Sequence, residues 1–187
     1  MTETDKYILD AIRKWVWSGF YSSDEVDSMI DDLLENDANE RMLRASVVPE
    51  FAKKREAEKT WPSITDCDRL GTVFAALEKR GILCLQNTGY TMSDGHEDAC
   101  EALSGHPKGK YFGYTFYHGQ DVERAVDGGG LTLAFDHVDG DVPDKLKVGL
   151  SVKEELEREG FVLNWNGTVD QRISIPHFDW KRRNSDD

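Results

Sequence analysis

The stretch YFGYTFYHGQDVERAVDGGGLTLAF, residues 111–135, decides the fold of the chain. Within residues 111–117, large side chains alternate between two faces, which is typical of a β-strand. Residues 120–126 are then predicted to form one or two helical turns, which end at the three glycines 128–130. Leu131 and Phe135 frame a second alternating run, so the stretch predicts a strand, a short helix and another strand.

Helices and strands also alternate on both sides of this stretch. Upstream, the sequence predicts a helix over 65–81, a buried strand over 82–86 and a short helix over 94–103. Downstream, it predicts a helix over 151–160, a strand over 161–165 and a strand over 173–175. The last two strands form a hairpin, so at least one pair is antiparallel. We therefore predict an α+β fold, in which a helical N-terminal region precedes a mixed five-stranded sheet packed with helices.

The first sixty residues carry helical patterns. Apolar side chains recur at helical spacing over 8–16. Another helix is predicted over 38–59, with a break or kink at Pro49, because proline lacks an amide hydrogen and crowds the preceding turn. These patterns divide the chain into a helical N-terminal region, 1–62, and an α+β domain, 63–187, either separate or continuous with it.

The chain is strongly acidic. Its 187 residues include 36 Asp and Glu against 23 Lys and Arg, a net charge of −13. The cationic cluster Lys181–Arg183 lies close to the end of the chain and is followed by two aspartates. Proteins that hold the phosphate backbone usually present a basic face, so we expect no nucleic-acid partner. The charge does not indicate an oligomeric state.

Targeting, membrane and metal signals are weak throughout the sequence. No apolar run reaches the roughly 18 residues of a membrane helix, and the acidic start of the chain is unlike a signal peptide. We therefore expect a cytoplasmic protein with no membrane partner. The three cysteines and five histidines lack the spacing of a disulfide framework or a zinc site. The segment 136–141 departs from a calcium loop at Val138, so we expect neither metal nor cofactor.

Two polar segments follow predicted strands and lead into predicted helices, at 86–96 and 117–124. If strands 82–86 and 111–117 run parallel, both segments lie at the same sheet edge, where ligands often bind. The candidate ligand-binding residues are Tyr90, Asp94, His118, Gln120, Asp121 and Arg124.

Each candidate has two interpretations. His118 and Asp121 could form an acid–base pair, with Gln120 and Arg124 holding a polar ligand. Alternatively, Gln120 or Asp121 caps the helix, and the polar side chains of 86–96 satisfy their own loop backbone. Arg172 is expected to pair with an acid across the last hairpin.

Several short strings carry a resemblance to known sequences. They are 81–95, 117–124, 129–131, 165–167, 171–173 and Trp180. On these strings, residues 65–183 resemble a bacterial domain family of unknown function. The resemblance implies a shared fold and no particular activity, and it leaves the N-terminal helices outside. It also draws attention to Gln120, Asp121 and Arg124.

Three functional hypotheses remain open. The acidity, small size and lack of an evident catalytic set favour an acidic binding module for a protein partner, for example one that neutralises a basic toxin or nuclease. The alternative is a small-molecule enzyme with its site at the loops 86–96 and 117–124. A third is a regulator that binds a protein through its N-terminal helices, where Trp15 and Trp17 point to different faces. Many carboxylates lie in predicted first turns of helices, where they offset the helix dipole, so charge alone does not decide.

Overall fold

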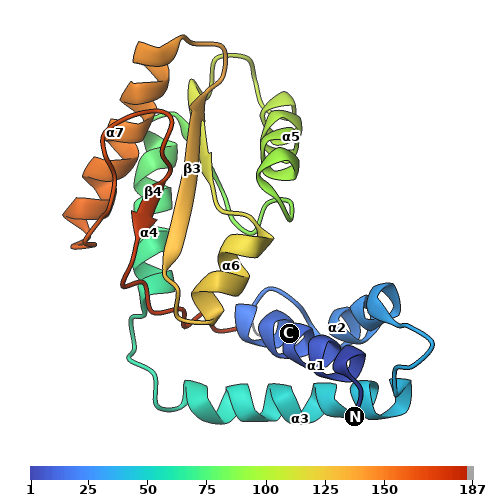
Figure 1. The fold of residues 1–187 in the computed structure, drawn as a ribbon. Coiled ribbons are helices and arrows are strands. Elements are labelled where there is room, and N and C mark those ends of the chain that lie inside the picture. Colours follow the sequence, from blue (N-terminus) through green and yellow to red (C-terminus); the bar gives the residue numbers. More distant parts are fainter. Residues whose placement is uncertain (185–187) are drawn as a thin grey trace. The chain divides into compact units, whose positions relative to one another are not determined.

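The computed structural model describes residues 1–184 (Figure 1). The chain forms two compact units. One contains Met1–Thr65 together with the C-terminal residues from Lys181, and the other contains Asp66–Trp180. Within residues 1–184, no helix is long and apolar enough to cross a membrane.

The N-terminal unit is helical. Its elements are α1 (Glu3–Ser18), α2 (Ser23–Met29), the 3-10 helix η1 (Ile30–Leu33) and α3 (Glu40–Glu58). Their apolar faces meet in a core made of Ile8, Ile12, Val16, Val26, Ile30, Leu43, Val47 and Phe51. Trp15 and Trp17 both pack against this core, although their positions on α1 face different sides. The reason is that α1 contacts α2, η1 and α3 and is covered on more than one side.

Helix α3 continues through Pro49, so the predicted break is wrong. Proline removes one hydrogen bond to the preceding turn, and here Pro49 lies on the exposed side of the helix. On the opposite side, Val47 and Phe51 are buried in the core before and after the proline. This packing supports the helix on both sides of the proline.

The second unit is an α+β fold. Its helices are α4 (Asp66–Lys79), α5 (Met92–Ser104), α6 (Gly119–Val126) and α7 (Val142–Arg158). Its strands are β1 (Ile82–Leu85), β2 (Gly113–Phe116), β3 (Leu131–His137) and β4 (Ile173–Ile175). The sheet order is β1-β2-β3-β4, with β1 parallel to β2 and the other neighbours antiparallel. The predicted α+β class and mixed sheet are confirmed.

The prediction of five strands is wrong, because the described sheet has four. The predicted strand 161–165 retains only one bridge, between Asn164 and Ser174. Beyond that bridge the chain folds back on itself, and the Trp165 indole donates hydrogen bonds to the carbonyls of Thr168 and Gln171 at 3.0 and 2.9 Å. Phe161 stacks on Phe178 and takes no part in a ladder.

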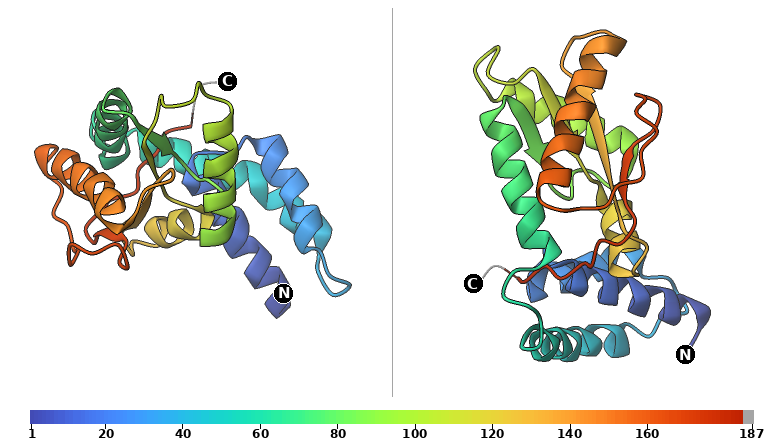
Figure 2. Two further views of the ribbon diagram at one scale, coloured as in Figure 1. Left: turned by 90° about the horizontal axis from the view of Figure 1, so that it is seen from above. Right: turned by 90° about the vertical axis from the view of Figure 1, so that its left-hand side faces the viewer.

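Helices cover both faces of the sheet. Helices α4 and α7 pack against each other and against β1 and β3, and α5 and α6 pack against β2 and β3. The views from the front and from above show these two pairs on opposite faces (Figures 1 and 2). Helix α5 approaches the sheet closely at Gly95, where a Cβ atom would lie 2.3 Å from the Phe116 ring.

Candidate functional site

The two predicted loops meet at one edge of the sheet. Because β1 and β2 are parallel, their carboxyl ends lie side by side. The backbone amide of Gly119 donates to the carbonyl of Gly89 at 2.9 Å, and that of Gln120 donates to the carbonyl of Tyr90 at 3.2 Å. The structure therefore brings segments 86–96 and 117–124 together.

His118 and Asp121 form the cap of α6. Asp121 accepts a hydrogen bond from the His118 backbone amide at 3.2 Å, and His118 Nδ1 accepts one from the Asp121 amide at 3.3 Å. Both side chains are enclosed, since His118 is 3% exposed and Asp121 is 0% exposed. The interpretation of Asp121 as a capping residue is therefore correct, and His118 shares that role.

Two arginines neutralise the buried carboxylate. Arg172 Nη1 lies 3.1 and 2.9 Å from the two oxygens of Asp121, and Arg124 Nη2 lies 2.5 Å from Oδ1. Arg172 was expected to pair across the last hairpin, but it reaches α6 instead. The reason is that α6 packs on β3, and β4 pairs with β3 directly after Arg172. The positive charge of Arg172 suggested an ion pair with an acidic residue. Which acidic residue it contacts depends on the strand order, which the sequence does not show.

The protonation of His118 follows from its surroundings. Burial lowers the pKa of this imidazole, and Arg172 and Arg124 lower it further, while Asp121 acts in the opposite direction. The ring is therefore neutral near pH 7. Its Nδ1 accepts from a backbone amide, and its Nε2 lies 3.2 Å from Asp121 Oδ2 and 3.2 Å from Arg172 Nη1.

The remaining candidates line the outside of this cluster. Asp94 accepts hydrogen bonds from the Thr91 and Tyr90 amides, which lowers its pKa and caps α5. Helix α5 thus begins at Met92, earlier than predicted. The exposed Tyr90 hydroxyl donates to Glu123 at 3.3 Å, and Gln120 is exposed. Of the six candidates, the structure joins His118, Asp121 and Arg124 in one network of hydrogen bonds and ion pairs.

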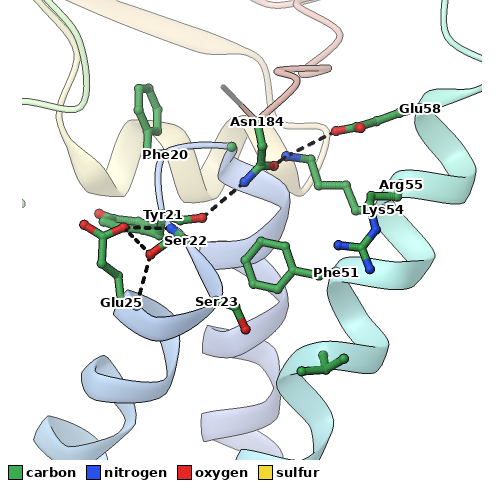
Figure 3. A pocket seen from close by; sticks show the side chains of 12 residues that line it. Phe20, Tyr21, Ser22, Ser23, Glu25, Phe51, Lys54, Arg55, Glu58 and Asn184 are labelled. Atoms are coloured by element: carbon green, nitrogen blue, oxygen red, sulfur yellow. Dashed lines mark hydrogen bonds and ion pairs between the residues drawn. The ribbon is translucent and has the colours of Figure 1, made fainter. Parts of the chain in front are cut away.

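A different region of the protein is hollowed, in the N-terminal unit beside α2. A pocket of about 520 Å³ lies between residues 19–25, α3 and Asn184 (Figure 3). Lys54 is 1% exposed in this pocket and donates to Asn184 Oδ1, with Glu58 Oε1 at 3.6 Å. Asn184 in turn donates to the Tyr21 carbonyl at 3.2 Å. Sequence reasoning missed this buried lysine, although its position continues the apolar stripe of α3.

Two shallower hollows flank α2. One, of about 410 Å³, is lined by Tyr21, Asp24, Glu25, Ser28 and Met29. The other, of about 370 Å³, is lined by Ser23, Asp24, Asp27, Ser28, Arg44, Val47 and Val48. We call the residues of these two hollows the α2 surface. Asp24 and Ser28 belong to both hollows and separate them.

The α2 surface lies in the most acidic part of the chain. Residues 19–39 contain seven acidic side chains and no lysine or arginine, namely Asp24, Glu25, Asp27, Asp31, Asp32, Glu35 and Asp37. Arg44 is bound by Glu40 at 2.9 Å, by Asp27 at 2.9 Å and by Asp31. Within residues 1–184, the side chains of Asp24, Asp32 and Glu35 have no ion pair. The α2 surface itself contains Asp24, Glu25 and Asp27 against Arg44, so its charge is negative.

Comparison with known proteins identifies the family of the chain and nothing more specific. No curated protein and no solved structure matches it significantly. A family model described as a domain of unknown function matches residues 1–184. This match confirms the resemblance, and it corrects the expectation that the N-terminal helices lie outside it. The chain therefore belongs to the family described as domain of unknown function DUF6891.

Proposed function

We propose that the chain is an acidic binding module for a basic protein partner, which docks on the α2 surface. The observation that carries this proposal is the pair of hollows on α2, which are lined mainly by residues 21–29, in a segment (19–39) with seven acidic and no basic residues, and to which α3 adds Arg44, Val47 and Val48. A basic toxin or nuclease is a suitable partner class, because such proteins present lysines and arginines to bind phosphate.

The lining of the hollows suits long cationic side chains. Lysine and arginine have apolar stems and charged ends. Their stems can pack against Tyr21, Met29 and Val48, the last of which is 64% exposed. Their charged ends then reach Asp24, which lines both hollows, whereas Asp27 is already paired with Arg44. A negative surface of this kind also accelerates the encounter with a basic partner by long-range attraction.

The contacts at the sheet edge give less support to the enzyme hypothesis. A general base needs a free lone pair within reach of substrate. Both oxygens of Asp121 accept from arginine, and His118 is enclosed with Nδ1 occupied by a backbone amide. These groups hold Arg172 against α6, so we assign this cluster to the fold.

Two variants with equal charge changes test the proposal. The first replaces Asp24→Asn, Asp32→Asn and Glu35→Gln on and beside the α2 surface. The matched control replaces Glu97→Gln, Asp98→Asn and Glu101→Gln on α5, which are equally exposed. Each variant moves the net charge from −13 to −10.

The probe is a fluorescent peptide of alternating lysine and leucine, with binding measured by anisotropy at low and physiological salt. Affinity is expected to fall about fivefold in the first variant, since each exposed ion pair contributes about 0.3 kcal/mol. The α5 control is expected to bind like the unmodified protein. Equal losses in both variants would show that net charge alone attracts the peptide, and would refute a defined α2 site.

A further inference from the structure

The second unit has a hollow of its own at the end of α5. It has a volume of about 410 Å³ and lies between α5, the loop leading to β2, and the residue after β3. Its apolar and aromatic lining consists of Leu103, Pro107, Tyr111, Tyr114 and Val138. We call this space the α5 hollow. Its size and lining are typical of a small-molecule site.

The charge of the α5 hollow is opposite to that of the chain. In a protein of net charge −13, no carboxylate lines it. Its lining includes Lys108 and His106, and Lys110 lies 4.7 Å from the Tyr111 ring centroid. The acidic residues of α5, such as Glu101, are absent from the lining. A cation therefore gains no counter-charge in this hollow, whereas an anion does.

Tyr114 gives the hollow a fixed polar group. Its side chain is 5% exposed, and its hydroxyl lies 2.9 Å from His96 Nδ1. Burial raises the pKa of Tyr114 and lowers that of His96. Both groups are therefore neutral near pH 7, and the tautomer of the imidazole decides which of the two donates. When the imidazole donates from Nδ1, the phenol O–H remains to donate to a ligand oxygen.

We propose that the α5 hollow binds a small aromatic carboxylate. The ring packs among Leu103, Pro107 and Tyr111, where His106 already meets Tyr111 edge to face at 5.0 Å between centroids. The carboxylate pairs with the Lys108 ammonium at the rim. This site lies in the second unit and is independent of the α2 surface.

Three probes with the same ring and different charges test the site. They are 2-naphthoate, 2-naphthamide and 2-naphthylmethylammonium. The readout is the rate at which iodoacetamide labels Cys100, an exposed thiol in the lining, followed by peptide mass spectrometry. Labelling at Cys67, which is absent from the lining, serves as the internal reference.

We expect 2-naphthoate to slow labelling of Cys100 at least fivefold, 2-naphthamide to act more weakly and the cation to have no effect. Lys108→Gln is expected to weaken naphthoate about threefold, as is usual for one exposed charge pair. Lys79→Gln on α4 makes the same charge change elsewhere and is expected to have no effect.

A second variant inserts a negative charge into the hollow. Val138 is 46% exposed, so Val138→Asp is compatible with folding. It is expected to abolish protection by naphthoate while leaving the circular dichroism unchanged. The proposal is overturned if naphthoate gives no protection, or if the three probes protect equally and Val138→Asp has no effect.

Discussion

At the scale of single residues, Asp121 joins segments that are distant in the sequence. Its carboxylate accepts from Arg124 one turn later on α6 and from Arg172 just before β4. The residue is fully buried, so its charge is stable only because these partners surround it. The ion pairs thus fasten the C-terminal strand to the short helix.

Replacing Asp121→Asn is expected to lower the free energy of unfolding by about 2–3 kcal/mol, because it leaves arginine charges without a buried counter-charge. Urea denaturation followed by circular dichroism measures this loss. Asp98→Asn, on the exposed side of α5, is the control and should change stability by less than about 0.5 kcal/mol. If Asp121→Asn also lowered the free energy of unfolding by less than about 0.5 kcal/mol, the role given to this carboxylate would be contradicted.

Stability is expected to decrease as the pH falls from about 7.5 to 5.5. His96 and His118 have a lower pKa in the folded protein than the ordinary value of about 6.5, mainly because they are buried. The unfolded chain therefore binds more protons in this range, and the free energy of unfolding falls with the pH. The charged groups facing these rings are Asp121, Arg172, Arg124, Asp94, Asp136 and Lys145.

The variant His96→Gln with His118→Asn should flatten this pH dependence, since asparagine still caps a helix. His177→Gln, at an exposed histidine, should leave it unchanged. Denaturation midpoints across the pH range provide the comparison. An unchanged slope in the double variant would show that other groups cause the decrease.

At the scale of helices and strands, the features that depend on local sequence were predicted better than those that depend on long-range contacts. Most helices could be predicted because periodicity and caps lie within the element itself, and the order of β1, β2 and β3 in the sequence was found correctly. The start of α7 at 151 was wrong: the helix begins at Val142, because Asp141 caps it and Pro143 suits a first turn. The prediction of a strand at 161–165 was wrong, because alternation of apolar and polar residues does not show whether a partner strand is available. The prediction of a helix break at Pro49 was wrong, because the packing of Val47 and Phe51 in the core outweighs the helix-breaking tendency of proline.

The candidate site shows the same limit. The sequence predicted that loops 86–96 and 117–124 would lie together if the strands before them were parallel, and β1 and β2 are parallel. The partner of Arg172 and the hollows on α2 could not be predicted, because they depend on strand order and on helix packing.

The contact of α5 with the sheet gives a prediction for two glycines. Gly95→Ala is expected to destabilise the protein by about 1–3 kcal/mol, because its Cβ would lie 2.3 Å from Phe116. Gly71→Ala, in α4, has open space and should stabilise it by about 0.5–1 kcal/mol through helix propensity. Thermal and urea denaturation of both variants measure the difference. If Gly95→Ala left stability unchanged or raised it, the close packing of α5 would be contradicted.

At the scale of the whole molecule, the net charge of −13 has several local origins. Some carboxylates cap helices, as Asp5 and Asp94 do, and Asp121 is neutralised by arginine. The excess in residues 19–39 is different, because it lies around hollows and contains no basic residue. Charge thus indicates a partner only where it is exposed, concentrated and joined to apolar surface.

The most direct test of the α2 surface is an NMR titration of the isotope-labelled chain with the alternating lysine–leucine peptide. We predict that chemical shifts change mainly at amides of residues 21–37 and at Val47 and Val48, and that raising the salt concentration reverses the changes. Shifts that are confined to the second unit, or that spread evenly over all acidic residues, would contradict the proposed binding surface.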